Sequence, residues 1–322
     1  MSGEPRRIPP QAFFAVSAVF HYLGPSLAVL LFARLDVLGV AWLRLASAAA
    51  VFAAWRRPWR AYRELGRADR GTLLALGLVL AVMNTMFYLA VGRLPLSTVG
   101  AIEFLGTVIL AAAGARTRRN AAALALTTAG VTAVTAIRLT GQPLGFAFAF
   151  ANCAGFVLYI VLGHRIASTG PRDGVTGTAG SRAADAIDQL GACMVVAALA
   201  ATPFGAVQAA TAFTHPLWLL WGLGVALCSS VIPYVSDQLA MARLPRATFA
   251  FLLALLPASA TVIGLVVLHQ VPTWRDVLGV TAVIAGVALH REAPTPQDGR
   301  AGTPADGRKD GRAAGRRGAR AK

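Results

Sequence analysis

The sequence has little charge, since only 14% of its 322 residues are Asp, Glu, Lys or Arg, against about 25% in a typical soluble domain. So small a charged fraction cannot cover the surface of a soluble enzyme, which excludes that class. Hydrophobic residues make up 56% of the chain, and the mean hydropathy is +0.61. They fall in blocks of about 20 residues, the length of a helix that crosses a bilayer. The composition therefore predicts a membrane protein.

Cysteine is also scarce. Cys153, Cys193 and Cys228 lie inside apolar blocks at no metal-ligand spacing, so we expect neither a disulfide framework nor a metal site. The chain also lacks a nucleotide-binding loop, a Gly-x-Ser-x-Gly nucleophile turn and a His-Glu-x-x-His zinc motif. These absences argue against an enzyme, against a cofactor and against transport driven by ATP within this chain.

Ten apolar blocks follow one another, and we expect each to form a transmembrane helix. They do not show the alternation typical of barrel strands. An all-α polytopic membrane protein is therefore predicted, because only helices and closed barrels satisfy their backbone groups in lipid. The predicted spans are 11–33, 37–55, 71–91, 95–114, 121–137, 145–166, 187–206, 217–240, 246–268 and 276–290.

The basic residues indicate how the chain is oriented. The net charge is +16, and most Arg and Lys residues lie in alternate connections and in the C-terminal segment. The other connections hold only Arg34, Arg93, Arg138 and Arg275. Because basic residues favour cytoplasmic loops, both termini are predicted to be cytoplasmic, in the plasma (inner) membrane. This charge does not line one amphipathic face, so we expect a lipid bilayer and no nucleic acid as partner.

Two stretches of the chain repeat one another. Residues 89–95 (LAVGRLP) recur as residues 239–245 (LAMARLP), with five identical positions. Each copy links the third and fourth spans of a set of five, and Gly130 and Gly286 hold similar places in the fifth and tenth spans. Five is odd, so the second set must be inverted in the membrane. Inverted repeats are common in transporters, which hold substrate near the midplane between the halves.

The repeat divides the chain into four parts. We expect a cytoplasmic N-terminus (1–10), a first five-helix repeat (11–140), a second, inverted five-helix repeat (141–292) and a C-terminal tail (293–322). The tail is rich in Gly, Arg, Ala and Pro and has no aromatic residue, so it is expected to be disordered. It is a solvated segment or one that contacts anionic lipid headgroups.

Three ionisable residues lie within predicted spans, where such groups are costly and usually functional. Glu103 follows Pro95 by eight residues, which places it about 12 Å deep. Desolvation there favours a neutral carboxyl that could exchange a proton or pair with a substrate ammonium; the alternative is a hydrogen bond to a neighbouring helix. Arg44 forms either a structural ion pair, for instance with Glu103, or a contact with a substrate carboxylate. Asp237 is shallower and is expected to line a cytoplasmic gate or to form an interfacial salt bridge.

Further polar residues in the spans are candidates for lining a path, or for plain helix–helix hydrogen bonds. They are Asn84, Tyr88, Asn152, Tyr159 and Tyr234. Three more residues are candidates for conformational roles. Gly106 allows close helix packing or approach of a ligand, Pro233 frees a backbone carbonyl, and Pro257 predicts a kink or a broken helix in the ninth span.

Several of these residues stand in segments that resemble a known family. The segments are Trp42-Leu43-Arg44-Leu45-Ala46, Ala101-Ile102-Glu103-Phe104-Leu105-Gly106, Ser230-Val231-Ile232-Pro233-Tyr234, Arg243-Leu244-Pro245 and Pro257-Ala258. With the ten-span layout, they resemble the EamA-type branch of the drug/metabolite transporter superfamily, and within it the bacterial inner-membrane threonine/homoserine exporters. The resemblance covers residues 11–290. It departs from that pattern at Thr107, Leu256 and His269-Gln270, where the family commonly has proline, glutamate and a Gly-Glu pair.

The resemblance implies efflux of small amino acids or related metabolites by exchange with protons. The chain is then a secondary transporter of a small molecule that works by alternating access. Export of a lipophilic cation, as in multidrug members, is the alternative within this class, and a membrane scaffold or receptor acting through the basic tail is the alternative from another class. The sequence leaves the substrate, the direction of transport and the oligomeric state open, a homodimer included.

Overall fold

The computed structural model describes residues 10–114, 117–135, 142–169, 179–241 and 256–289, and every regular element within them is a helix. The first half contains α1 (Pro10–Leu31), α2 (Val37–Arg56), α3 (Trp59–Glu64), α4 (Arg67–Val91), α5 (Leu96–Gly114) and α6 (Arg118–Thr135). The second half contains α7 (Pro143–Thr169), α8 (Ala179–Gly205), the 3₁₀ turn η1 (Ala210–Thr214), α9 (Pro216–Ala226), η2 (Leu227–Val231), α10 (Ile232–Met241), α12 (Leu256–Leu268) and α13 (Trp274–Leu289).

Five helical segments are long and apolar enough to cross a membrane. They are Val37–Arg56, Arg67–Val91, Pro143–Gly163, Ala184–Gly205 and Pro216–Asp237. Three shorter apolar helices accompany them, at Ala15–Leu31, Leu96–Gly106 and Leu256–Leu268. The all-α fold is thereby confirmed for the described residues, whereas the total of ten spans stays a prediction. The N-terminal part of the predicted ninth span, the basic tail and residues 242–245 of the second heptapeptide copy lie outside the described residues.

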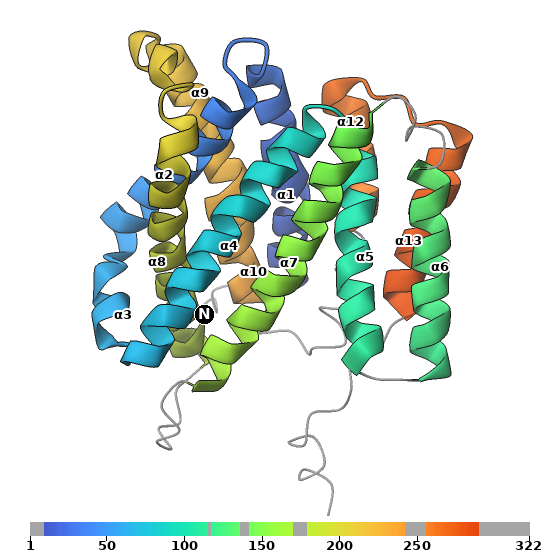
Figure 1. Cartoon of the computed structure of the whole chain (residues 1–322), viewed down its shortest axis with the longest axis horizontal. Helices are drawn as coiled ribbons and strands as arrows, with labels where there is room; N and C mark the ends of the chain where they lie inside the picture. The colour runs from blue at the N-terminus through green and yellow to red at the C-terminus, as the bar shows by residue number, and fades with distance from the viewer. Residues whose placement is uncertain (1–9, 115–116, 136–141, 170–178, 242–255, 290–322) are drawn as a thin grey trace, which may run out of the picture.

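The long helices stand side by side in one bundle, with α6 and α13 at one edge and α2, α8 and α9 toward the other (Figure 1). Two helices have equal rank when they form the same span, first to fifth, of their own half. The spans are α1, α2, α4, α5 and α6 in the first half and α7, α8, α9 to α10, α12 and α13 in the second. Three pairings join helices of equal rank, namely α2 with α8, α5 with α12 and α6 with α13. The other main pairings across the halves are α4 with α7, α4 with α8, α5 with α7, α1 with α10, α1 with α12 and α2 with α9. Every helix that carries a candidate residue thus contacts the opposite half.

Small residues allow the helices of the α6–α13 pair to approach closely. A Cβ atom added at Gly130 would lie 2.5 Å from the backbone oxygen of Gly279. One added at Gly286 would lie 2.8 Å from the backbone oxygen of Ala123 and would collide with the Thr127 hydroxyl. Because backbone atoms cannot move aside cheaply, only glycine fits at both positions. The two glycines that hold similar places in the repeat therefore serve the same helix pair.

The eighth predicted span is one continuous helical stretch with a change of winding in its middle. Between α9 and α10, residues 227–231 wind as a π-helix, in which the Ile232 N–H donates to the Leu227 oxygen. Pro233 follows in the first turn of α10, where it has no N–H to donate to Ser229 four residues earlier. A π-turn inside an α-helix is frequent at functional sites, which draws attention to this point of the bundle.

Side chains close several helix ends. The Asp36 carboxylate accepts a 2.8 Å hydrogen bond from the Leu38 N–H at the start of α2. At the start of α13, Thr273 and Asp276 bond each other reciprocally, as in a capping box. The Gln270 side chain accepts a 3.1 Å bond from the Leu96 N–H and so caps α5 from the α12–α13 connection. Gln270, a departure from the family pattern, therefore joins the ends of α5 and α12.

Candidate functional site

Glu103 lies on α5 and is 7% exposed. Its Oε2 atom is buried and has no hydrogen-bond partner. Among the described residues, the one ion pair within 4 Å is Arg56–Asp188, so the Glu103 carboxyl is not part of a salt bridge there. A buried carboxyl without a partner is costly in a protein interior. An arrangement of this kind is suited to binding a proton or a cationic group of a ligand.

Two other polar groups without partners lie beside Glu103. Asn152 of α7 is 1% exposed, and its side chain faces the Glu103 carboxyl, but its Nδ2 atom has no well-aligned hydrogen bond. The Tyr22 hydroxyl of α1 is buried and unpartnered, and it interacts electrostatically with Glu103. Three helices thus bring an amide, a phenol and a carboxyl with unused hydrogen-bonding capacity to one place.

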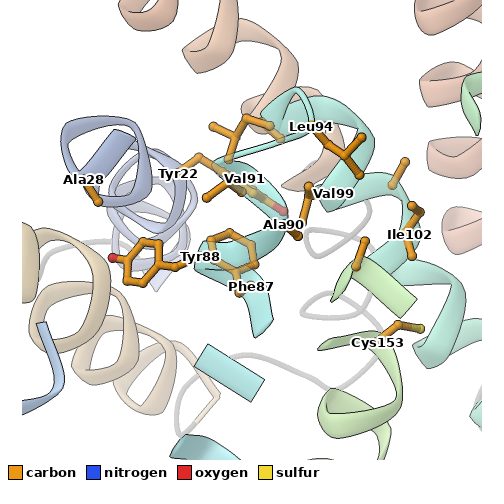
Figure 2. Packing of buried hydrophobic residues seen from close by; sticks show 14 of the residues in the cluster. Tyr22, Ala28, Phe87, Tyr88, Ala90, Val91, Leu94, Val99, Ile102 and Cys153 are labelled. Carbon is orange, nitrogen blue, oxygen red and sulfur yellow. The ribbon is translucent and has the colours of Figure 1, made fainter. Parts of the chain in front are cut away.

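The absence of a side chain at Gly100 makes room for Tyr22. A Cβ atom added at Gly100, one helical turn before Glu103, would lie 3.1 Å from the Tyr22 hydroxyl and 3.2 Å from Ala260 Cβ of α12. In Figure 2, Tyr22 extends from α1 toward α5, where Val99 and Ile102 are labelled. Gly106, one turn after Glu103, packs against α7, since a Cβ there would lie 2.9 Å from the Cys153 sulfur. Both glycines allow close packing on the Glu103 face.

Arg44 of α2 is 5% exposed and contacts the second half. Its Nε donates a 2.9 Å hydrogen bond to the Ser230 hydroxyl, and its Nη2 donates a 3.1 Å bond to the Ser229 carbonyl. The guanidinium also lies 5.3 Å from the centre of the Tyr88 ring, within the range of a cation–π interaction. The ion pair of Arg44 with Glu103 that the sequence allowed is not formed.

Tyr234 and Asp237 extend the polar cluster along α10. The Tyr234 phenol interacts electrostatically with Arg44, Glu103 and Asp237. Asp237 lies near Ser17 of α1, and its Oδ1 atom is buried and unpartnered. Tyr234 is therefore within electrostatic range of both carboxyls. No salt bridge involves Asp237 in the part of the chain that the structure describes.

The remaining candidates differ in their surroundings. The Asn84 amide donates a 2.8 Å bond to Leu80 O of its own helix. Tyr88 is fully buried with an unpartnered hydroxyl, and Figure 2 shows its ring beside Phe87 on α4. Tyr159 stacks on Phe156 and interacts electrostatically with Tyr234 and Asp237. Asn84 is thus satisfied within α4, whereas the two tyrosines belong to the cluster.

Pro257 lies in α12 and is buried. The residues before Leu256 are outside the described part of the chain. The predicted kink in the ninth span therefore stays a prediction.

Sequence reasoning missed Tyr22, Ser17 and Ser229. Serine and tyrosine are ordinary in transmembrane helices, so composition gives no signal for them. Ser229 could have been found, since Pro233 four residues later leaves its carbonyl without a helical donor.

The chain is similar to known proteins over most of its length. It is 31% identical over 295 residues to the threonine/homoserine exporter RhtA of Salmonella typhimurium (strain SL1344), an alignment that covers 88% of this chain and 93% of that protein. The same protein of Escherichia coli (strain K12) is 31% identical over 294 residues, with the same shares covered. The profile of the EamA-like transporter family matches residues 173–291. The chain belongs to the EamA-like transporter family.

A solved crystal structure shares the fold. It aligns with 87% of this EamA-like chain and 96% of its own, with a TM-score of 0.53 and 17% sequence identity. Membership of a transporter family, together with the apolar helices, makes the chain a membrane transporter and not an enzyme.

Proposed function

We propose that this EamA-like protein exports small amino acids or related metabolites, of the threonine or homoserine type, across the plasma membrane. The observation that carries the proposal is the Glu103 carboxyl, buried without an ionic partner where α5 of the first half meets α7 of the second. The similarity to threonine/homoserine exporters over most of the chain supports the substrate class.

The groups around Glu103 match the polar atoms of such a substrate. The carboxylate would accept hydrogen bonds from a substrate ammonium, or bind a proton in its absence. The Asn152 amide and the Tyr22 hydroxyl, both without partners, would take up a hydroxyl or carboxylate of the substrate. Competition between ammonium and proton for one carboxyl would couple export to the proton gradient.

The helix pairings support two inverted repeats, residues 11–140 and 141–292. Each helix can be replaced in thought by the helix of equal rank in the other half. The α4–α7 pairing then becomes α1–α10, and the α5–α7 pairing becomes α1–α12. All four pairings are present. The same replacement turns α4–α8 into α2–α9 and leaves α2–α8, α5–α12 and α6–α13 unchanged. Such a symmetry permits alternating access by relative motion of the halves. Cytoplasmic termini follow from the distribution of Arg and Lys.

Flux into proteoliposomes tests the proposal. We expect labelled threonine or homoserine to be transported by the purified protein when a proton gradient is imposed. Glu103→Gln has nearly the same shape but cannot ionise, so it should abolish gradient-dependent flux while the protein still inserts and unfolds at an unchanged temperature. Full gradient-dependent flux in Glu103→Gln would refute the coupling role.

The matched control is Asn84→Ala, because the Asn84 amide is satisfied within its own helix. It should keep most of the flux. If neither amino acid is transported by the unmodified protein, the substrate class is wrong. Resistance of cells to lipophilic cations would then test the alternative, since an unpaired buried carboxyl next to aromatic rings also suits such cations.

A further inference from the structure

The break in the eighth span leaves a backbone group in need of a donor. The Ser229 carbonyl lacks its α-helical partner, because that partner would be the N–H that Pro233 does not have. Ser229 is 2% exposed and Ser230 is fully buried. Water therefore does not reach this point, and in a membrane an unsatisfied carbonyl costs several kcal/mol. Some other group has to supply the hydrogen bond.

Arg44 supplies it from the first half. One nitrogen of the guanidinium donates to the Ser229 carbonyl at 3.1 Å and another donates to the Ser230 hydroxyl at 2.9 Å. The Tyr234 phenol lies close enough to interact with the same guanidinium. These three groups lie within one and a half turns, on either side of Pro233. Helix α1 packs closely against Ser229 as well, since a Cβ atom added at Gly24 would lie 2.5 Å from the Ser229 nitrogen.

A carboxylate does not compete for Arg44 in the described structure. No ion pair within 4 Å involves this guanidinium among the residues described. Its face covers the Tyr88 ring at 5.3 Å, which leaves the cation bordered by backbone, hydroxyls and an aromatic surface. Its donors are thus directed at the broken helix, whereas a residue dedicated to a substrate carboxylate would leave them free.

We propose that Arg44 is a positioning residue that replaces the hydrogen bond lost at Pro233 and so fixes the direction of α10. Tyr234 and Asp237 follow the break by one residue and by four, and both take their orientation from α10. Through these contacts α2 of the first half sets the geometry of the carboxyl and the phenol that the second half contributes. The transport readout rests on the proposed function, while the structural readouts do not depend on any substrate.

Restoring the missing N–H tests this directly. Arg44→Met removes the donors and retains much of the volume, and we expect it to lower the unfolding temperature by about 5 °C. Backbone amides of residues 230–237 other than Pro233 should exchange with deuterium about tenfold faster. Adding Pro233→Ala returns an N–H to the Ser229 carbonyl. The double variant should recover most of the unfolding temperature, the slow exchange and the threonine flux.

The matched control is Pro203→Ala, which returns an N–H inside α8 and is not among the residues that Arg44 bonds. It should not rescue Arg44→Met. If Arg44→Met fails to accumulate in the membrane, recovery of accumulation by Pro233→Ala alone carries the same test.

Two results would overturn the proposal. One is an absence of recovery in the double variant, or equal recovery with Pro203→Ala. The other is recovery of stability and exchange without flux, which would make Arg44 a direct substrate ligand. If the unmodified protein transports neither amino acid, the proposed substrate fails, but unfolding and exchange still decide the role of Arg44.

Discussion

Tyr22 shows how one side chain can indicate function by being unsatisfied. Its ring is fully buried, yet its hydroxyl has no partner and lies against the backbone of α5 near Glu103. A hydroxyl in this state contributes nothing to stability, because its desolvation is not compensated. If it is retained for a ligand, its removal should affect transport and leave the fold intact.

We therefore predict that Tyr22→Phe unfolds at the same temperature as the unmodified protein or slightly higher. Its kcat/KM for threonine should fall about tenfold, the loss expected for one hydrogen bond to a charged group. Thermal unfolding in detergent and proteoliposome flux measure the two effects. Lower stability with unchanged flux would show that the hydroxyl has a structural role.

For single residues, the sequence predicts which ionisable side chains lie in apolar spans better than it predicts their hydrogen-bonding partners. Glu103 and Arg44 are identifiable because ionisable groups are rare in apolar spans. Their partners depend on which faces of distant helices meet. Ser230 is 186 residues from Arg44, and Asn152 approaches Glu103 only once α5 and α7 pack together. No local pattern encodes such a pairing.

Among the helices, the α6–α13 pair depends on glycine at its contact. A methyl group at Gly286 would meet the backbone of α6, so one of the helices has to move. We predict that Gly286→Ala lowers the free energy of unfolding by about 1–3 kcal/mol, as overpacking does in other tight cores.

Gly224→Ala in α9 provides the comparison. Nothing lies within 4 Å of a Cβ at Gly224, so this substitution only improves helix propensity and should be neutral or stabilising. Both variants are compared by thermal unfolding in the same detergent. An equal effect of the two substitutions would contradict the packing argument.

Element boundaries follow closely from the sequence, and changes of winding do not. The predicted span 37–55 is observed as Val37–Arg56, and 71–91 as Arg67–Val91. Apolar block length sets these limits, since a helix must match the bilayer. The π-turn at 227–231 was not predicted, because the sequence shows a proline but not how the preceding turn accommodates it. The cap that Gln270 forms on Leu96 depends on tertiary proximity and has no local signal.

At the scale of the whole molecule, side-chain bonds join α2 and α8 near both ends of their contact, which we call the α2–α8 seam. At one end, Arg56 and Asp188 form a bidentate ion pair, with nitrogen–oxygen distances of 2.6 and 3.1 Å. At the other, the Trp42 indole donates a 3.0 Å bond to the Thr202 hydroxyl. The α4–α7 pairing includes apolar packing of Met83 on Gly155, which shears at little cost. The halves are thus expected to move about the seam.

We predict that a covalent link across the seam leaves transport intact. Arg56→Cys and Asp188→Cys, joined by a short bis-maleimide after replacement of the three native cysteines, should keep most of the flux. Met83→Cys with Gly155→Cys, oxidised to a disulfide across α4 and α7, should arrest it. Flux before and after reduction of the disulfide provides the control. Arrest by the seam link and free transport with the second link would reverse this assignment.

The fastened seam has a practical consequence for following the protein in motion. If α2 and α8 stay together through the proposed cycle, they provide a fixed frame against which the other pairings would change. Probes attached to α2 and α8 would report one constant separation, against which the displacement of a probe on any other helix can be read. The contacts at the two ends of α2 would thereby supply a constant reference distance for following the helix displacements during transport.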